Sequence, residues 1–306
     1  MSLPLLVQND DYLKPFAVQI AGLHSGIAEK RAALLHSQSS LSDFANGHLF
    51  FGVHRDKKFL VFREWAPAAT GIWLIAGMNG WKKDDRYAFS AISPGIWELR
   101  IEAALLPHGT LYKLIIAWSG GEGERLPAWG RRVVQDEKTK WFSAQIWFPK
   151  PYRWKNESPP PPANPLIYEA HTGMSSEEGK VATFNEFTAN ILPYIARSGY
   201  NMVQLMAVQE HPYYGSFGYH VSNFFAPSSR FGTPEDLKKL IDTAHGLGLR
   251  VIMDIVHSHA VKNENEGISR YDGTYYQFFH EGPRGEHVAW DSRCFNYDKH
   301  EVLHFL

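Results

Sequence analysis

The sequence lacks the features that mark several large classes of protein. Its 306 residues include one cysteine, Cys294, so an internal disulfide framework is excluded and a reducing compartment is expected. The formal net charge is −1, and this balance favours neither a nucleic acid nor a membrane surface as a partner. No apolar run approaches the roughly 20 residues of a membrane span, and residues 1–7 do not resemble a signal peptide. A soluble cytoplasmic protein is therefore expected.

Motifs for phosphate and nucleotide chemistry are also absent from the sequence. The chain has no glycine-rich phosphate loop, no Ser-His-Asp motif and no dinucleotide fingerprint, and we expect no cofactor. Aromatic residues are abundant instead, at 14% of the chain, with 10 Trp, 14 Tyr and 19 Phe. Many of these rings must form the core, but a neutral chain rich in aromatic residues also suits uncharged, flat-faced ligands such as sugars.

Hydrophobic spacing and turn residues divide the chain into four segments. Apolar residues recur at helical spacing over residues 10–36, with a break at Gly26. Short β-rich runs then predict a β-sandwich, with strands at residues 49–54, 59–65, 72–76, 96–102, 111–118 and 141–148. Four consecutive prolines at residues 159–162 indicate a semi-rigid linker. We expect the four segments to be helices at 1–46, a sandwich at 47–150, a linker at 151–165 and a further domain at 166–306.

After the linker, the pattern alternates between strands and helices. Apolar strands are expected at residues 165–170, 200–208 and 249–256. The first intervening helix begins at a capping box of Thr183 and Glu186, and Pro193 either kinks this helix or marks its true start. Thr233 caps the second helix, and acidic residues in the first turn favour it further. This order of apolar strands and helices predicts parallel βαβ units.

The densest polar cluster closes the third of these strands, with the sequence Asp-Ile-Val-His-Ser-His. Polar residues at the carboxyl end of a parallel strand lie where α/β folds bind ligands. Asp254, Val256 and Ser258 would share one face, and His257 and His259 the other, if the strand persists. Such a His-x-His pair near an aspartate could bind zinc. A hydrogen-bonded histidine near the surface is favoured, because no second tight pair of such ligands occurs.

Two further segments are expected at the same mouth of the sheet. The aromatic loop at residues 210–220 follows the second strand, and loops of this length are usually functional. Most of its rings should pack the loop down, but one exposed ring is enough to stack on a sugar. The segment at residues 262–293 should form a lid or wall over the mouth, although a variable surface loop is nearly as well supported for its charged first half.

At these residues the chain resembles the 1,4-alpha-glucan (glycogen) branching enzymes of the alpha-amylase superfamily, particularly the eukaryotic-type group. Residues 254–259 are similar to the first signature region of the superfamily, at the end of the third barrel strand, with Ser258 where the wider superfamily usually has Asn. Other matching motifs lie at residues 11–15, 51–55, 64–67, 79–81, 214–219, 229–234 and 282–285. The resemblance covers nearly the whole chain.

The resemblance implies a multidomain fold and a group-transfer reaction. The fold would consist of a helical N-terminal leader, a β-sandwich carbohydrate-binding module of family 48, and the first three or so βα units of a TIM (β/α)8 barrel. The family cleaves an alpha-1,4-glucan and transfers the segment to a 6-hydroxyl, forming alpha-1,6 branches by a retaining mechanism. The nucleophile Asp and the acid/base Glu are expected beyond Leu306, so the 306-residue chain alone is expected to be inactive.

Four residues at the mouth are expected to bind the alpha-glucan substrate: Tyr219, Asp254, His257 and His259. Tyr219 would stack on the ring of the glucose that is attacked, and His259 would hydrogen-bond one of its hydroxyls. Asp254 would fix the local geometry as an acid with hydrogen-bond partners. Glu210 is the second carboxyl group near this pocket. Neither Asp254 nor Glu210 lies at the strands that carry the family's catalytic residues. No metal is expected.

The sandwich should bind alpha-glucan through exposed side chains. Trp65, Pro67 and Trp81 are the candidates, and Trp81 is favoured because it follows an Asn-Gly turn. Trp97 is expected in the core, because it alternates with charged residues.

Two other functions remain open from the sequence. One is a non-catalytic glycan-binding protein with a partial barrel, and the other is an alpha-1,6-debranching hydrolase with the same domain order. Counting reducing ends separates a hydrolase from a transferase, because only hydrolysis creates new ends.

Overall fold

The computed structural model describes residues 4–35 and 40–306 and divides the chain into two compact units. One unit comprises residues 1–49 and 297–306, and the other comprises residues 50–296. The sandwich and the parallel strands therefore lie in the same unit. The expected division into segments at 1–46, 47–150, 151–165 and 166–306 stays a prediction. None of the described helices is both long and apolar enough to cross a membrane.

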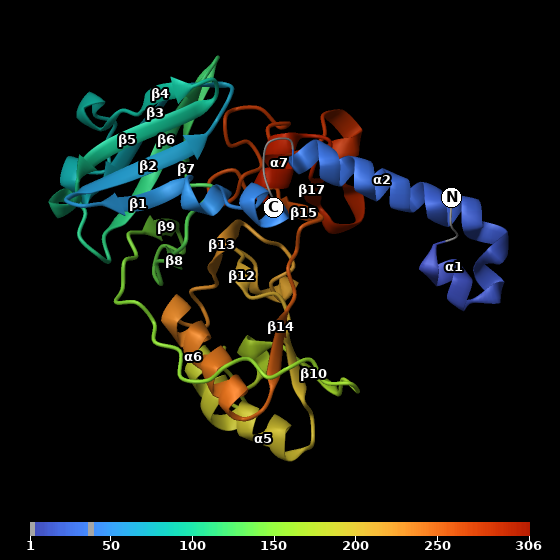
Figure 1. The fold of residues 1–306 in the computed structure, drawn as a ribbon. Helices are drawn as coiled ribbons and strands as arrows, with labels where there is room; N and C mark the ends of the chain where they lie inside the picture. The colour runs from blue at the N-terminus through green and yellow to red at the C-terminus, as the bar shows by residue number, and fades with distance from the viewer. Residues whose placement is uncertain (1–3, 36–39) are drawn as a thin grey trace. The chain divides into compact units, whose positions relative to one another are not determined.

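The first unit is helical. It contains α1 (Leu5–Asn9), a 3-10 turn (Asp11–Phe16), α2 (Ala17–Leu35), α3 (Leu41–Phe44) and α7 (His300–Phe305). The expected break at Gly26 is wrong, because α2 runs through this residue without interruption (Figure 1). Phe44 packs edge-on against His300, with 5.0 Å between the ring centroids. None of the 19 residues of α2 is buried, so the leader helix contributes no core residue to the described part of this unit.

The second unit begins with two antiparallel sheets. One sheet has the order β1 (Gly52–Asp56), β2 (Phe59–Trp65), β5 (Ile96–Glu102) and β4 (Ser90–Ser93). The other has the order β3 (Ala69–Ala76), β6 (Leu111–Trp118), β9 (Phe142–Gln145) and β8 (Val133–Gln135), with β7 (Gly121–Arg125) also paired to β6 (Figure 1). The expected sandwich strands are present, and three strands that the sequence did not indicate, β4, β7 and β8, extend the sheets.

Alternation explains why the sandwich strands form. In β6 the side chains of Tyr112, Leu114 and Ile116 are buried while their neighbours are not, which is the period of a strand with one face on a core. Phe62 on β2 meets Tyr112 edge-on across the core at 5.5 Å between ring centroids. The strands that the sequence missed are short, and β7 is made of glycine and charged residues, so that pairing and not intrinsic propensity holds it.

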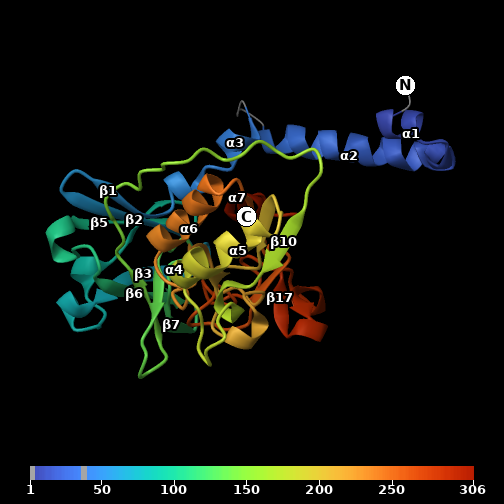
Figure 2. The ribbon, with the colours of Figure 1, turned by 90° about the horizontal axis from the view of Figure 1, so that it is seen from below.

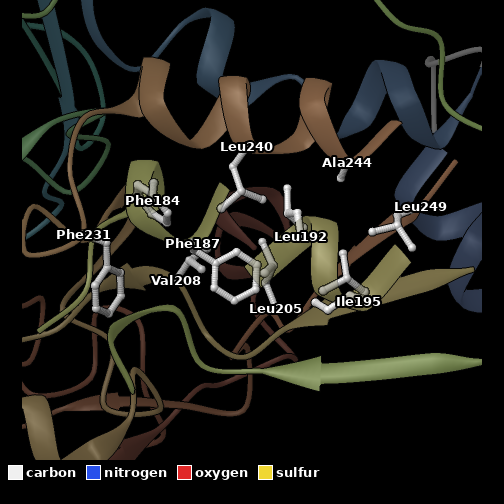
Figure 3. Close-up of a cluster of buried hydrophobic side chains, with 11 residues drawn as sticks. Phe184, Phe187, Leu192, Ile195, Leu205, Val208, Phe231, Leu240, Ala244 and Leu249 are labelled. Atoms are coloured by element: carbon white, nitrogen blue, oxygen red, sulfur yellow. The ribbon is translucent and has the colours of Figure 1, made fainter. Parts of the chain in front are cut away.

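Three parallel strands follow the linker, as the alternating pattern predicts. They are β10 (Ile167–Ala170), β11 (Met202–Leu205) and β14 (Arg250–Met253), paired in that order. The connecting helices are α4 (Phe184–Glu186), which continues through a π-helical turn (Phe187–Ile191) into α5 (Leu192–Arg197), and α6 (Pro234–Gly246). Figure 2 shows α4 beside α6. Phe187, Leu192, Leu205 and Leu240 are fully buried between helices and sheet (Figure 3).

The predicted helix starts are confirmed. The Thr183 side chain accepts a hydrogen bond from the Glu186 backbone N–H, and the Glu186 carboxylate accepts one from the backbone N–H of Thr183. Thr233 and Asp236 form the same reciprocal pair at α6. Pro193 lies in the first turn of α5, directly after the π-helical turn, which is a position that tolerates a residue without an N–H.

The third parallel strand ends earlier than expected. β14 stops at Met253, residues 254–258 are irregular, and His259 begins a separate strand, β15 (His259–Val261). β15 pairs with β17 (Ser292–Cys294), which pairs with β16 (Glu286–His287), all antiparallel. The expectation that His257 and His259 share one strand face is therefore wrong, because the chain leaves the parallel sheet before reaching them.

The first half of the segment at residues 262–293 packs against the sandwich. The Tyr271 hydroxyl donates to Glu64 Oε2 at 2.8 Å, and Gln277 Nε2 donates to the Trp65 carbonyl at 2.5 Å. Arg125 Nη2 donates to the Arg270 carbonyl at 2.8 Å. A loop that only lies on the surface is therefore excluded for this part of the segment, because Tyr271 and Gln277 are buried and bonded to the sandwich.

The contact between this segment and the sandwich includes a buried carboxyl group, that of Glu64. It accepts hydrogen bonds from Tyr271 and, at 3.3 Å, from the Ala128 backbone N–H. Burial raises the pKa of Glu64 from 4.5 to about 8. Between these values the folded protein holds a proton that the unfolded chain has lost, so stability from this group is complete below pH 4.5 and is lost as the pH rises through 8.

We predict that Glu64→Gln removes this pH dependence, because an uncharged amide can accept the same hydrogen bonds. Urea unfolding at pH 5 and pH 8.5 measures the effect: the wild-type protein should lose stability relative to the variant as the pH rises. Glu102→Gln, which changes an exposed glutamate on β5, is the matched control and should follow the wild type. Parallel pH profiles for Glu64→Gln and wild type would contradict a protonated Glu64.

Candidate functional site

A cavity of about 700 Å³ opens beside the carboxyl ends of the parallel strands. Its lining comes from the aromatic loop, from His259 and from the turn at residues 288–291, and consists of Tyr213, Gly215, Ser216, Tyr219, His220, His259, Ala289, Trp290 and Asp291. Two of the four predicted substrate-binding residues, Tyr219 and His259, thus line one cavity. The other two, Asp254 and His257, do not belong to this lining.

Asp254 connects the cavity to the sheet. Its Oδ2 atom accepts a hydrogen bond from the Tyr219 hydroxyl at 2.6 Å, and its Oδ1 atom accepts one from Gln204 Nε2 on β11 at 2.8 Å. The same amide group also reaches Glu169 Oε1 on β10 at 3.3 Å. Burial, and next the bond to Asp254, raise the pKa of Tyr219 to about 12. Asp254 therefore fixes the Tyr219 ring relative to the strand ends.

The loop before Tyr219 needs glycine to bring the ring to this place. Gly218 has a φ of 89°, and a Cβ atom added there would lie 2.0 Å from the Ala207 carbonyl oxygen. Phe217 before it is also left-handed, with a φ of 54°. Only a residue without a side chain allows so close an approach to the backbone that follows β11, which accounts for the glycine at this position.

Two histidines, His220 and His259, line the cavity, and a third, His287, contacts His259. His259 is 1% exposed, and its ring centroid lies 5.9 Å from that of His220 and 5.7 Å from that of His287. Burial, followed by the two neighbouring histidines, lowers the pKa of His259 to about 4, so the ring is neutral near pH 7. Its Nδ1 atom is buried without a hydrogen-bond partner among the described residues. A neutral ring with free hydrogen-bonding capacity suits an uncharged hydroxyl group.

The arrangement of ligands that zinc would need is not present among the described residues. His257 is half-buried outside the cavity lining, and His259 belongs to another strand. Within residues 4–35 and 40–306, no group of three His, Cys, Asp or Glu side chains is arranged to hold a metal.

Glu210, the other carboxyl group near the pocket, is fully buried beneath the aromatic loop. It accepts hydrogen bonds from the Ser228 hydroxyl at 2.9 Å and from the Ser229 backbone N–H at 2.7 Å. Its Oε1 also lies 3.7 Å from Arg230. Burial raises the pKa of Glu210 in spite of these bonds. The residue anchors the base of the loop and does not line the cavity.

Trp81 on the sandwich is held on a defined turn. Asn79 Oδ1 accepts a hydrogen bond from the Ala76 backbone N–H, and Asn79 Nδ2 donates to the Leu74 carbonyl, both at 2.9 Å. Gly80 and Trp81 are both left-handed, with φ of 63° and 59°. The Asn-Gly pair thus builds the turn that carries Trp81, and 40% of this residue is exposed.

The other expected surface residues differ from one another. Pro67 is exposed. Trp65 does not present a free ring, because it is half-buried edge-on against Phe278, at 5.2 Å between the ring centroids. Trp97 is half-buried and donates its Nε1–H to the Ala66 carbonyl at 3.0 Å. The sequence could not separate Trp65 from Trp81, because Phe278 comes from a segment more than 200 residues away.

Three more tryptophans are more than half exposed: Trp141, Trp154 and Trp290. Only Trp290 lines the cavity with Tyr219 and His259. Trp290 belongs to the segment at residues 262–293 that was expected to form a lid. Its exposure depends on the pairing of β16 with β17, which the sequence did not indicate.

Comparison with known proteins gives two matching families. Residues 50–130 match the family of carbohydrate-binding module 48 (isoamylase N-terminal domain), and residues 186–297 match the alpha amylase catalytic domain. The chain is 44% identical to a 1,4-alpha-glucan-branching enzyme of Yarrowia lipolytica and 42% identical to one of Felis catus, in each case over 98% of its length. It spans 45% and 44% of those two proteins. The resemblance that the motifs predict is therefore confirmed.

Solved structures give a consistent picture. A putative alpha amylase from Salmonella typhimurium superposes with a TM-score of 0.65 at 26% identity, covering 84% of this chain and 40% of that one. A pullulanase from Bacillus acidopullulyticus superposes with a TM-score of 0.68 at 20% identity, covering 83% of this chain and 35% of that one. The second likeness concerns the fold alone.

We predict that Tyr219 and Asp254 are energetically coupled. Tyr219→Phe removes the hydroxyl and keeps the ring, and Asp254→Ala removes the acceptor. A double-mutant cycle of the free energy of unfolding should give a coupling of about 1 kcal/mol, as expected for a half-exposed hydrogen bond to a carboxylate. The pair Tyr213→Phe and Asp254→Ala is the control, because Tyr213 lines the same cavity and no bond joins it to Asp254. Equal coupling in both cycles would contradict a specific Tyr219–Asp254 bond.

Proposed function

We propose that a chain so similar to 1,4-alpha-glucan-branching enzymes is itself part of an enzyme that cleaves an alpha-1,4-glucan and transfers the segment to a 6-hydroxyl. The observation that carries this proposal is 41–44% identity to such enzymes over 98% of the chain or more. The substrate would be a glycogen- or starch-like polysaccharide. The cytoplasmic location expected from the sequence stays a prediction.

The finer fold proposal is that β10, β11 and β14 are the first three strands of a (β/α)8 barrel. Their parallel order, with helices between them, supports this, as does the match of residues 186–297 to an alpha amylase catalytic domain. In such barrels the active site lies at the carboxyl ends of the strands. The cavity beside Asp254 has that position.

Within this function, Tyr219 and His259 would hold the glucosyl unit that is attacked. Their places on one cavity support the assignment. Tyr219 would stack on the sugar ring while Asp254 keeps the Tyr219 hydroxyl engaged, and neutral His259 would bond a sugar hydroxyl. The retaining reaction also needs two carboxyl groups, a nucleophile and an acid/base. Asp254 is bound to Tyr219 and Gln204, which suits a positioning role and not the nucleophile. A role of His257 at the substrate stays a prediction.

The sandwich would provide a second contact with the polysaccharide. The exposed ring of Trp81 on its fixed turn is the part of the sandwich best placed for this, with exposed Pro67 as a further candidate. A flat indole face can hold the apolar face of a glucose ring without any charge.

A debranching hydrolase and a non-catalytic glucan-binding protein are the alternatives. The names of the relatives favour transfer over both, because the Yarrowia lipolytica, Felis catus and Dictyostelium discoideum proteins are all called 1,4-alpha-glucan-branching enzymes.

A branching assay tests the reaction. The protein that carries this chain, produced at the length of its relatives, should lower the iodine absorbance of amylose while the number of reducing ends stays constant. A rise in reducing ends in step with the loss of absorbance would instead indicate hydrolysis. No change in either would leave glucan binding as the function.

Binding by the sandwich is tested with affinity electrophoresis in gels containing glycogen. We expect the chain to be retarded, and Trp81→Ala to lose most of that retardation because the stacking ring is gone. Trp154→Ala, which removes an exposed ring from the linker, is the matched control and should migrate like the wild type. Equal mobility of Trp81→Ala and the wild type would overturn the assignment of Trp81.

A further inference from the structure

The wall of the cavity opposite the aromatic loop is a small hairpin. β16 and β17 pair so that Glu286 lies opposite Arg293 and His287 opposite Ser292. A 3-10 turn (Val288–Trp290) joins them and leaves Trp290 at the tip. β17 also pairs with β15, so the hairpin lies beside the strand that begins at His259.

Ion pairs fix this hairpin at both sides of its tip. Lys262 Nζ lies 2.6 Å from Asp291 Oδ1 and 2.7 Å from Glu286 Oε2, and Arg293 pairs with Glu286. Asp291, directly after the tryptophan, takes a left-handed conformation with a φ of 46°. The position of Trp290 is therefore held by backbone pairing and by a network of four charged groups.

The ring of Trp290 is supported on one side and open elsewhere. His287 stacks on it, with 4.7 Å between the ring centroids and 14° between the planes, and His259 lies 4.9 Å away at 51°. In spite of these contacts, 52% of the residue is exposed. A large aromatic ring that is held in place yet left half open has the properties of a binding anchor.

The opposite wall of the cavity is aromatic as well. Tyr213 is 65% exposed, and Gly215 leaves room for its ring, since a Cβ atom at Gly215 would lie 2.5 Å from the Tyr213 ring. Asp291 carries the one carboxylate among the lining residues, and Lys262 forms an ion pair with it. The cavity of about 700 Å³ is larger than one glucosyl unit needs and is suited to an uncharged ligand with flat faces.

We propose that Trp290 is a substrate-binding residue that stacks on the glucosyl unit next to the one held by Tyr219 and His259. The cavity would then take two consecutive units of an alpha-1,4-glucan, the second against the rigid hairpin. This inference rests on the proposed function, because it assumes that the cavity takes alpha-glucan. To the proposed function, this inference adds Trp290 as a contact with the glucan, a second subsite, and a dependence of affinity on the length of the glucan chain.

Oxidative footprinting of tryptophan, read by mass spectrometry, tests the contact residue by residue. The 306-residue chain would be oxidised with and without maltohexaose, and Trp154, which is also 52% exposed, serves as the internal control. We expect maltohexaose to protect Trp290 and to leave Trp154 unprotected. Oxidation of Trp290 at the same rate with and without sugar would overturn the proposal.

Variants then separate a binding role from a structural one. In a Trp81→Ala background, Trp290→Ala should weaken maltohexaose binding about tenfold, as for loss of one aromatic anchor, and should weaken glucose binding little. Trp290→Phe should restore most of the affinity, because a flat ring returns. Equal affinities of Trp290→Ala and its parent for maltohexaose would overturn this inference alone. If the wild-type chain binds no maltooligosaccharide at all, the glucan function proposed for the cavity fails as well.

Discussion

The hydrogen bonds of Asp254 are the interaction on which the candidate site depends. β14 ends at Met253, and the next side chain accepts hydrogen bonds from Gln204 on the neighbouring strand and from Tyr219 in the aromatic loop. One carboxylate thereby joins two strand ends to the loop that lines the cavity. The Ala207 backbone also hydrogen-bonds to the Tyr219 hydroxyl, and the Asp254 carboxylate adds the side-chain contact between this residue and the sheet.

The side chains around the cavity suit an uncharged ligand. His259 is buried and neutral near pH 7, and Asp291, the carboxylate of the lining, is paired to Lys262. Aromatic rings stand on both walls, from the loop and from the β16–β17 hairpin. Such a site gains most of its binding free energy from flat apolar faces and gains orientation from a few polar atoms. This combination agrees with the neutral, aromatic-rich composition of the chain.

Local rules predicted the regular elements well. Capping boxes at Thr183 and Thr233 and the apolar runs placed the helix starts and the parallel strands, because those signals act within a few residues. Long-range packing could not be predicted in the same way. Phe278 packs edge-on against Trp65, and Tyr271 donates a hydrogen bond to Glu64, although each pair is more than 200 residues apart in the sequence. The pairing of β15 with β17 likewise removed His259 from the strand face expected for it.

The central claim is that alpha-glucan lies in the cavity between the aromatic loop and the hairpin. A crystal structure of the chain grown with maltohexaose tests it most directly. The account predicts two consecutive glucosyl units in the cavity, one on the ring of Tyr219 within hydrogen-bond distance of His259 and the next on the ring of Trp290. Sugar bound only at the sandwich surface around Trp81, with the cavity free of it, would contradict the account.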